Sequence, residues 1–158
     1  HVDWLKGQKT GFFIDQRDNR SLLEKYAMGK SVLNMFCYTG GFSVYAMRGN
    51  AKLVHSVDSS AKAIELTNQN VELNFPNDNR HEAFCEDAFK FLNANENKYD
   101  LIVLDPPAFA KHRAVFTAAA QAGRKVRIMH QLHQPADHPI NIFHPEGEYL
   151  KGLVLYVE

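Results

Sequence analysis

"SVLNMFCYTGGFS", residues 31–43, joins an apolar run to a turn that contains two adjacent glycines. The run over residues 31–36 has the composition of a buried strand. Gly40 and Gly41 allow backbone N–H groups in the turn to come close to a ligand. A strand, a glycine turn and a helix begin a βαβ unit, so this stretch predicts a parallel sheet with a ligand-binding turn at one strand end.

Two further apolar runs end in an acidic residue. "LVHSVD" ends at Asp58 and "YDLIVLD" ends at Asp105. Apolar runs of this length, bounded by turn residues, are typical of strands that are buried on both faces. We therefore expect strands over residues 31–36, 53–58 and 99–105, with their carboxyl ends at the same edge of one sheet.

Amphipathic segments separate these strands. Residues 59–74 repeat apolar side chains near helical spacing behind a serine cap, and residues 87–95 predict a short helix capped by Asp87. Residues 80–87 predict a short strand. Strands that alternate with helices predict an α/β fold with a doubly wound, mostly parallel, Rossmann-like sheet.

The pattern changes after Asp105. Residues 113–123 predict a helix that ends at a glycine, and residues 124–134 and 148–158 predict strands, the last of them antiparallel. Only seven letters, "PPAFAKH", separate Asp105 from that helix, although a strand–helix–strand unit takes about 30 residues. We therefore expect that a segment is missing near residues 111–113.

Length and composition set the class of protein. A chain of 158 residues suits one domain, which we divide into a lid and hairpin over residues 1–30 and a core over residues 31–158. No apolar stretch approaches the ~18 residues of a membrane span, so no membrane partner is expected. Lys and Arg total 18, as do Asp and Glu, so no overall basic field indicates nucleic acid. Two separated cysteines without a CxxC pair favour a reducing, cytoplasmic setting.

The three strand ends together indicate a nucleoside cofactor. Asp58 follows Gly40 at close to the ~20-residue spacing at which an acid can bind ribose hydroxyls. The dehydrogenase pattern G-x-G-x-x-G and the P-loop pattern are both missing from the turn. A turn with few glycines suits a ligand without a pyrophosphate, and S-adenosylmethionine is the common one.

"DPPAF", which runs from Asp105 to Phe109, supplies the reaction side. Two prolines stiffen the backbone, so the acid and the aromatic ring can both be held toward the cofactor. An aromatic ring can stack on a base, and Asp105 can accept a hydrogen bond from an exocyclic amine. The alternative is a turn that closes a strand, with Phe109 in the core.

Five stretches carry a resemblance to a known family: "GQKTGFFIDQRDNR", "VLNMFCYTGGFSVYA", "VHSVDSSAKAIELTNQNVELN", "YDLIVLDPPAFAK" and "ADHPINIFHPEGEYLKG". They closely resemble the RlmI/RlmK-like class I methyltransferases, which use S-adenosylmethionine to modify 23S ribosomal RNA. The cytosine-5 branch is the most similar. The resemblance covers essentially the whole chain, and it implies a ribosomal RNA substrate.

The resemblance also implies a role for individual residues. The turn after the first strand would surround the methionine part of the cofactor, the second strand end would hold the ribose, and the start of the helix over residues 87–95 would flank adenine. Residues 9–20 would form a lid strand and hairpin, and Asp105 would lie next to the transferred methyl group. The implied cofactor-binding residues are Phe36, Tyr38, Thr39, Gly40, Asp58, Ser59, Asp87, Ala88, Asp105, Gln16, Arg17 and Arg20.

The sequence departs from the family in ways that bear on the chemistry. Family members carry a PUA-type RNA-binding domain and a linking domain that this sequence does not match. They also have a helix and strand after "DPPAFAK", which lead to a Ser-Cys-Ser loop with the nucleophilic cysteine. Cytosine C5 is not nucleophilic until a thiolate adds at C6. Cys37 and Cys85 do not suit that role, and we expect both to be packing residues.

Several alternatives stay open. The same core could methylate a guanine ring nitrogen, which needs no cysteine, or the chain could be a non-catalytic cofactor-binding or RNA-binding module. The basic residues of "QRDNR" could contact RNA phosphates or lie in a solvated turn. Four C-terminal histidines lack the acids or cysteines of a metal site, so no metal is expected. A homodimer is open.

Overall fold

The computed structural model describes residues 1–3, 5, 7, 11–105, 119 and 121–123, together with the backbone of four short C-terminal strands. After a single 3-10 turn, η1 (Ile14–Gln16), the helices are α1 (Arg17–Tyr26), α2 (Gly41–Arg48), α3 (Ala61–Asn74) and α4 (Ala88–Ala94). The strands are β1 (Ser31–Met35), β2 (Leu53–Asp58), β3 (His81–Cys85), β4 (Leu101–Leu104), β5 (Val126–Met129), β6 (Ile142–Phe143), β7 (Tyr149–Leu150) and β8 (Val154–Val157).

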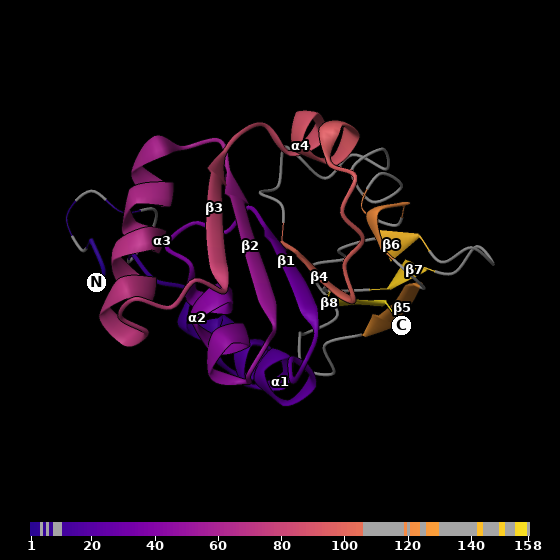
Figure 1. Cartoon of the computed structure of the whole chain (residues 1–158), viewed down its shortest axis with the longest axis horizontal. Coiled ribbons are helices and arrows are strands. Elements are labelled where there is room, and N and C mark those ends of the chain that lie inside the picture. The colour runs from indigo at the N-terminus through magenta and orange to yellow at the C-terminus, as the bar shows by residue number, and fades with distance from the viewer. Residues whose placement is uncertain are drawn as a thin grey trace.

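The main sheet has the order β3-β2-β1-β4-β8-β5 (Figure 1). The first four strands are parallel, whereas β8 pairs antiparallel with both β4 and β5. β6 and β7 form a separate antiparallel pair. The α/β class and the parallel sheet that we expected from the sequence are confirmed, and the carboxyl ends of β1, β2 and β4 lie at one edge.

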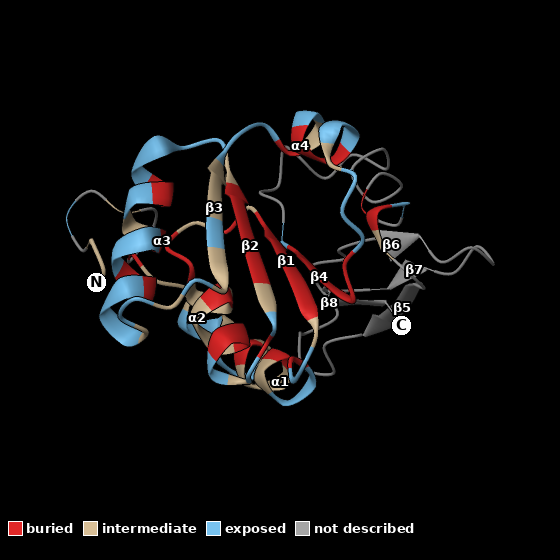
Figure 2. Ribbon diagram, viewed as in Figure 1, coloured by how far each residue is buried: buried red, intermediate tan, exposed pale blue. Residues whose placement is uncertain are grey.

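Helices cover both faces of the parallel strands. α1, α2 and α3 pack on one face, where Leu23, Met47 and Val71 meet Val32 and Val54. On the other face α4 covers a second apolar cluster, which includes Leu33, Met35, Ile102 and Leu104. Consequently β1, β2 and β4 are buried on both sides, while β3 at the sheet edge is mostly half-buried or exposed (Figure 2).

Polar side chains fix the helix starts that the sequence predicts. Ser60 caps α3 by accepting a hydrogen bond from the amide of Ala63, and Asp87 caps α4 by accepting from Phe89 and Lys90. Capping side chains satisfy N–H groups that have no partner inside the helix. The expected serine and aspartate caps are therefore confirmed.

The hairpin that we expected within residues 1–30 is wrong for its second half, because Arg17–Tyr26 is a helix. Arg20, Leu23 and Ala27 are buried at helical spacing and face α2. Of the two alternatives left open for "QRDNR", the solvated turn is wrong for the same reason, since Arg20 is only 4% exposed.

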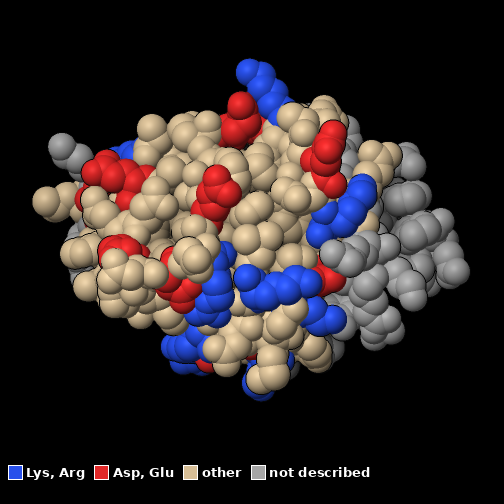
Figure 3. Space-filling model, viewed as in Figure 1, with Lys and Arg blue, Asp and Glu red and all other residues tan. Residues whose placement is uncertain are grey.

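At the C-terminal end, the expected final strand is divided into β7 and β8, and β6 was not expected. Among the helices in the described part of the chain, none is both long and apolar enough to cross a membrane. The face shown in Figure 3 carries acidic and basic side chains together, and neither sign covers it.

Candidate active site

The turn after β1 has an unusual backbone. Phe36, Tyr38 and Gly40 have φ values of 55°, 51° and 76°. The first two are strained, because a side chain at positive φ crowds its own backbone. Two hydrogen bonds pin the turn: the amide of Cys37 donates to the Val57 carbonyl at 3.0 Å, and the amide of Gly40 donates to the Cys37 carbonyl at 2.9 Å. A strained and firmly held loop of this kind is typical of ligand sites.

Asp58 connects this turn to the end of β2. One carboxylate oxygen accepts a hydrogen bond from the amide of Tyr38 at 3.0 Å, and the other accepts from the amide of Ser60 at 2.9 Å. Each carboxylate oxygen can accept more than one hydrogen bond, so both retain capacity for a hydroxyl pair. The two amides fix the direction in which the carboxylate points. Ser59, the next residue along the chain, is exposed.

The adjacent strand end supplies Asp87 and Ala88. Asp87 Oδ1 accepts hydrogen bonds from the amides of Phe89 and Lys90 at 2.9 and 3.1 Å. Its Oδ2 accepts none from the described residues. The amide of Glu86 donates to the Asp58 carbonyl at 3.0 Å, which ties this strand end to the previous one. Ala88 is 8% exposed and packs in the core beside the exposed Asp87.

Asp105 stands exposed just after β4. The side-chain amide of Gln16 donates to Asp105 Oδ2 at 3.4 Å, across 89 positions of sequence. Asn19 Nδ2 in turn donates to Gln16 Oε1 at 2.6 Å, which orients the glutamine amide. The structure therefore brings the segment before the core into contact with the end of β4.

The two arginines of this segment differ in placement. Arg20 is buried, donates to the Phe13 carbonyl at 2.9 Å, and lies 4.4 Å from the centroid of the Phe12 ring. Burial lowers the pKa of its guanidinium from the ordinary value. Its Nε has no hydrogen-bond partner among the described residues. Arg17 is exposed and pairs with Asp18 at 3.1 Å, so the structure does not bring it to the other candidates.

The expectation that both cysteines are packing residues holds for one of them. Cys37 is 5% exposed, and burial raises the pKa of its thiol to about 12. The expectation is wrong for Cys85, which is exposed because β3 is the edge strand. The sulfur of Cys85 approaches the Ser59 carbonyl at 3.7 Å. Since β2 and β1 lie between β3 and β4, Cys85 is far from Asp105 in the sheet order.

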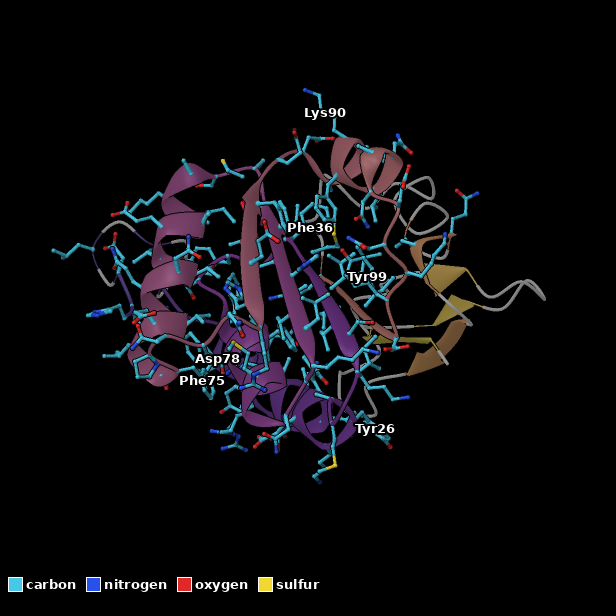
Figure 4. All side chains as sticks on the ribbon, viewed as in Figure 1. Tyr26, Phe36, Phe75, Asp78, Lys90 and Tyr99 are labelled. Carbon is cyan, nitrogen blue, oxygen red and sulfur yellow. The ribbon has the colours of Figure 1, made fainter. Side chains whose placement is uncertain are left out.

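Some candidates act through the backbone or lie elsewhere. Phe36 is labelled in Figure 4 beside β1, and its partly buried ring packs against the cluster beneath α4, so its backbone forms the turn while its side chain serves the core. Phe109 and the four C-terminal histidines lie outside the described residues.

Sequence reasoning missed Thr67 and Asn70 of α3, whose side chains donate hydrogen bonds to carbonyl groups of the turn. They were missed because the helix was expected to contact the sheet through its apolar residues, so its polar residues were not considered.

The groups at these strand ends suit a nucleoside with an amino-acid tail. A carboxylate with free acceptor capacity, a second acid at a helix cap, and a glycine turn at a helix start lie on adjacent strand ends. In open α/β sheets such a crevice is where ligands bind.

Comparisons with known proteins agree. The family model for S-adenosylmethionine-dependent methyltransferases matches residues 1–142. A ribosomal RNA large subunit methyltransferase I of Aeromonas hydrophila is 40% identical over 200 positions, which cover 98% of this chain and 50% of that protein. The chain thus spans about half the length of the curated relatives it matches. Since 98% of the 158-residue chain is about 155 residues, roughly 45 of the 200 aligned positions of the relative have no counterpart here.

Solved structures share the fold. A methyltransferase of Agrobacterium tumefaciens is 34% identical, with a TM-score of 0.58 over 62% of this chain and 33% of that one. An O-methyltransferase of Bacillus cereus shares the fold, at 22% identity and a TM-score of 0.61 over 74% of this chain and 55% of that one. The resemblance stated from the sequence is confirmed. The chain belongs to the family of S-adenosylmethionine-dependent methyltransferases.

Proposed function

We propose that this chain is the catalytic core of an enzyme that methylates a base in large-subunit ribosomal RNA of the 23S type, at C5 of cytosine. One observation carries the proposal: Asp58 is fixed by amides at one strand end, while Asp105 stands exposed at another end of the same sheet edge. The first arrangement suits a cofactor, and the second places an exposed carboxylate where a substrate could reach it. The similarity to an enzyme named for large-subunit ribosomal RNA supports the substrate class.

The cofactor side has residues for each part of S-adenosylmethionine. Asp58, with Ser59 beside it, would accept hydrogen bonds from the ribose hydroxyls. Asp87 and Ala88 would flank adenine, through the free Oδ2 of the acid and the apolar wall beside it. The turn residues Phe36, Tyr38, Thr39 and Gly40 would enclose the methionine part. Gln16 would close the site from the N-terminal segment, with the buried Arg20 behind it. Arg17, which is exposed and pairs with Asp18, is left out of the proposed site.

Asp105 is the residue that we assign to the target base. Bound S-adenosylmethionine supplies an electrophilic methyl group. Asp105 would accept a hydrogen bond from the exocyclic amine of the base and so hold the ring in line with that group, with Phe109 stacked on the ring. Gln16 donates to one carboxylate oxygen of Asp105 at 3.4 Å, and each carboxylate oxygen can accept more than one hydrogen bond.

Cytosine chemistry requires a thiolate that the described residues do not offer. Cys37 is buried with a raised pKa, and Cys85 lies at the far edge of the parallel strands. We propose that the nucleophilic cysteine belongs to a segment missing near residues 111–113 of the core, which spans residues 31–158 behind the N-terminal lid of residues 1–30. The extra positions in the curated relative support this proposal.

A guanine ring nitrogen is the second candidate target. Its lone pair can attack the methyl group directly, so the lack of a suitable cysteine among the described residues favours it. A non-catalytic cofactor-binding or RNA-binding module is the third candidate, and it requires that no reaction loop exists.

The test compares this chain with a version that carries the gene's full sequence across residues 111–113. Both are incubated with labelled S-adenosylmethionine and ribosomal RNA, and the modified nucleoside is identified by mass spectrometry. We expect 5-methylcytosine from the longer chain only. Methylguanine would favour the second candidate, and a gene that is contiguous at this point would contradict the cytosine assignment.

Two further assignments follow from the proposed substrate. An enzyme of ribosomal RNA acts in the cytoplasm, where the thiol of its nucleophile stays reduced. A homodimer is part of the proposal, and sedimentation equilibrium tests it by giving the mass of either one chain or two.

A further inference from the structure

We infer that Thr67 and Asn70 of α3 are positioning residues for the cofactor turn, residues 36–40. They reach the turn through its backbone carbonyl groups. The inference rests on the proposed use of this turn to bind S-adenosylmethionine. It assigns to α3, which was expected only to cover the sheet, a share in shaping the site.

Both side chains hold carbonyl groups of the turn. The hydroxyl of Thr67 donates to the Tyr38 carbonyl at 3.0 Å, and the side-chain amide of Asn70 donates to the Thr39 carbonyl at 2.9 Å. Thr67 is fully buried and Asn70 is 8% exposed. A buried hydrogen bond of this kind is costly to break, because the carbonyl would be left without a partner.

Holding a carbonyl also fixes the N–H group of the same peptide. The peptide unit is planar and trans, so its N–H points away from its carbonyl. With the Tyr38 carbonyl turned toward α3, the N–H of Thr39 points to the opposite side of the turn. The next peptide is held at both ends, because its N–H, on Gly40, donates to the Cys37 carbonyl. Thr67 and Asn70 therefore determine which N–H groups the turn presents.

Close packing adds to these bonds. A Cβ placed on Gly40 would lie 2.7 Å from Thr67 Cγ2, so the turn is seated directly on α3. At the start of α3, the amide of its N-cap residue Ser60 donates to Asp58. One helix thus sets both the carboxylate assigned to the ribose and the turn assigned to the methionine part. In Figure 1 α3 lies beside β3, with its start toward the edge where β2 ends.

The experiment uses four variants of the full 158-residue chain. Thr67→Val removes the hydroxyl and keeps the shape, Thr67→Ser keeps the hydroxyl, and Asn70→Asp replaces the donor with an acceptor. Val71→Ala is the matched control, since Val71 is a buried residue of the same helix that packs in the core and makes no bond to the turn. Each variant is measured for its melting temperature, its Kd for S-adenosylhomocysteine by calorimetry, and its amide hydrogen exchange without ligand.

A positioning role predicts a specific pattern. Thr67→Val should weaken binding about five- to tenfold, Asn70→Asp should weaken it at least as much, and Thr67→Ser should stay within about twofold. The amides of Cys37 and Gly40 should exchange about tenfold faster in the first two variants. Val71→Ala should lower the melting temperature without changing Kd by more than about twofold.

The inference is overturned if Thr67→Val and Asn70→Asp bind S-adenosylhomocysteine as tightly as Val71→Ala does when their melting temperatures are the same. It is also overturned if amide exchange in the turn is unchanged. It can also be separated from the proposed function. Chains that show the binding pattern but never methylate ribosomal RNA would refute the function and leave the inference standing. If the wild-type chain binds no cofactor, exchange in the turn still decides whether the two residues hold it.

Discussion

The two sides of the candidate site are built differently. On the cofactor side, the turn after β1 and Asp58 after β2 are held by amide and side-chain hydrogen bonds of 2.9–3.0 Å. On the reaction side, Asp105 is exposed, and its contact with Gln16 is 3.4 Å long. We therefore expect the described residues to bind the cofactor, and the proposed function assigns the rest of the reaction site to residues beyond them.

Replacement of Gly40 should produce the largest effect. Gly40→Ala puts a side chain at a φ of 76° and 2.7 Å from Thr67 Cγ2, so strain and overlap add. We expect a loss of about 3 kcal/mol or more in the free energy of unfolding, measured with urea, and loss of cofactor binding. Gly29→Ala is the control: its φ is 69°, but no atom lies within 4 Å of the added carbon. It should cost about 1 to 2 kcal/mol from strain alone, and equal losses would contradict the close contact with α3.

The two acids should separate binding from reaction. Asp58→Asn replaces an oxygen that accepts from an amide with a group that cannot accept, so Kd for S-adenosylhomocysteine should rise roughly 10- to 100-fold. Asp105→Asn should leave Kd within about threefold and abolish methyl transfer by the chain with its complete active site. Calorimetry and a labelled-methyl assay measure the two quantities. If Asp105→Asn weakened binding as much as Asp58→Asn, the division between the two sides would be wrong.

The contact between His81 of β3 and Ser56 of β2 should depend on pH. His81 Nε2 is 2.8 Å from Ser56 Oγ, and the hydrogen bonds continue from Ser56 to Ser43 and from Ser43 to Asn34. Burial lowers the pKa of His81 to about 4. Between that value and the unfolded value near 6.5, the unfolded chain binds more protons than the folded one. Stability should therefore fall by about 1 to 2 kcal/mol as pH drops through this window.

Urea unfolding at several pH values measures this dependence. His81→Gln should reduce the slope, and the remainder should come from His55, whose pKa burial also lowers. An unchanged slope in His81→Gln would show that burial does not lower the pKa of His81 in the folded chain.

The smallest effect is expected at Cys85. Because its position is at the edge strand, Cys85→Ser should keep both cofactor affinity and methyl transfer within about twofold of the wild type. Thiol reagents should modify Cys85 in the folded protein and reach Cys37 only on unfolding, because Cys37 is buried with a raised pKa. Loss of activity in Cys85→Ser would identify a nucleophile on the wrong side of the sheet and refute the missing-segment proposal.

Local sequence signals were enough for much of the fold. Apolar runs predicted β1, β2 and β4, and Ser60 and Asp87 were recognisable as caps because their side chains act on amides two or three positions away. α1 was missed because a charged residue, Arg20, occupies a position on its buried face where an apolar residue is expected. The Phe12 ring packs against the guanidinium there.

Contacts between distant backbone atoms left no such signal in the sequence. Thr67 and Asn70 interrupt the apolar face of α3, and their partners are carbonyl groups, which every residue has. Asp58 could be found because an acid at a strand end is unusual, but the amides of Tyr38 and Ser60 that orient it appear only in three dimensions. The exposure of Cys85 depends on the strand order, which the sequence does not specify.

Calorimetric titration of the 158-residue chain with S-adenosylhomocysteine tests the central claim most directly. The claim is that these residues alone complete the cofactor side. The account predicts binding of one molecule per chain, together with no methylation of ribosomal RNA until the segment near residues 111–113 is restored. A chain shown to be folded by circular dichroism and cooperative unfolding, yet unable to bind, would contradict it.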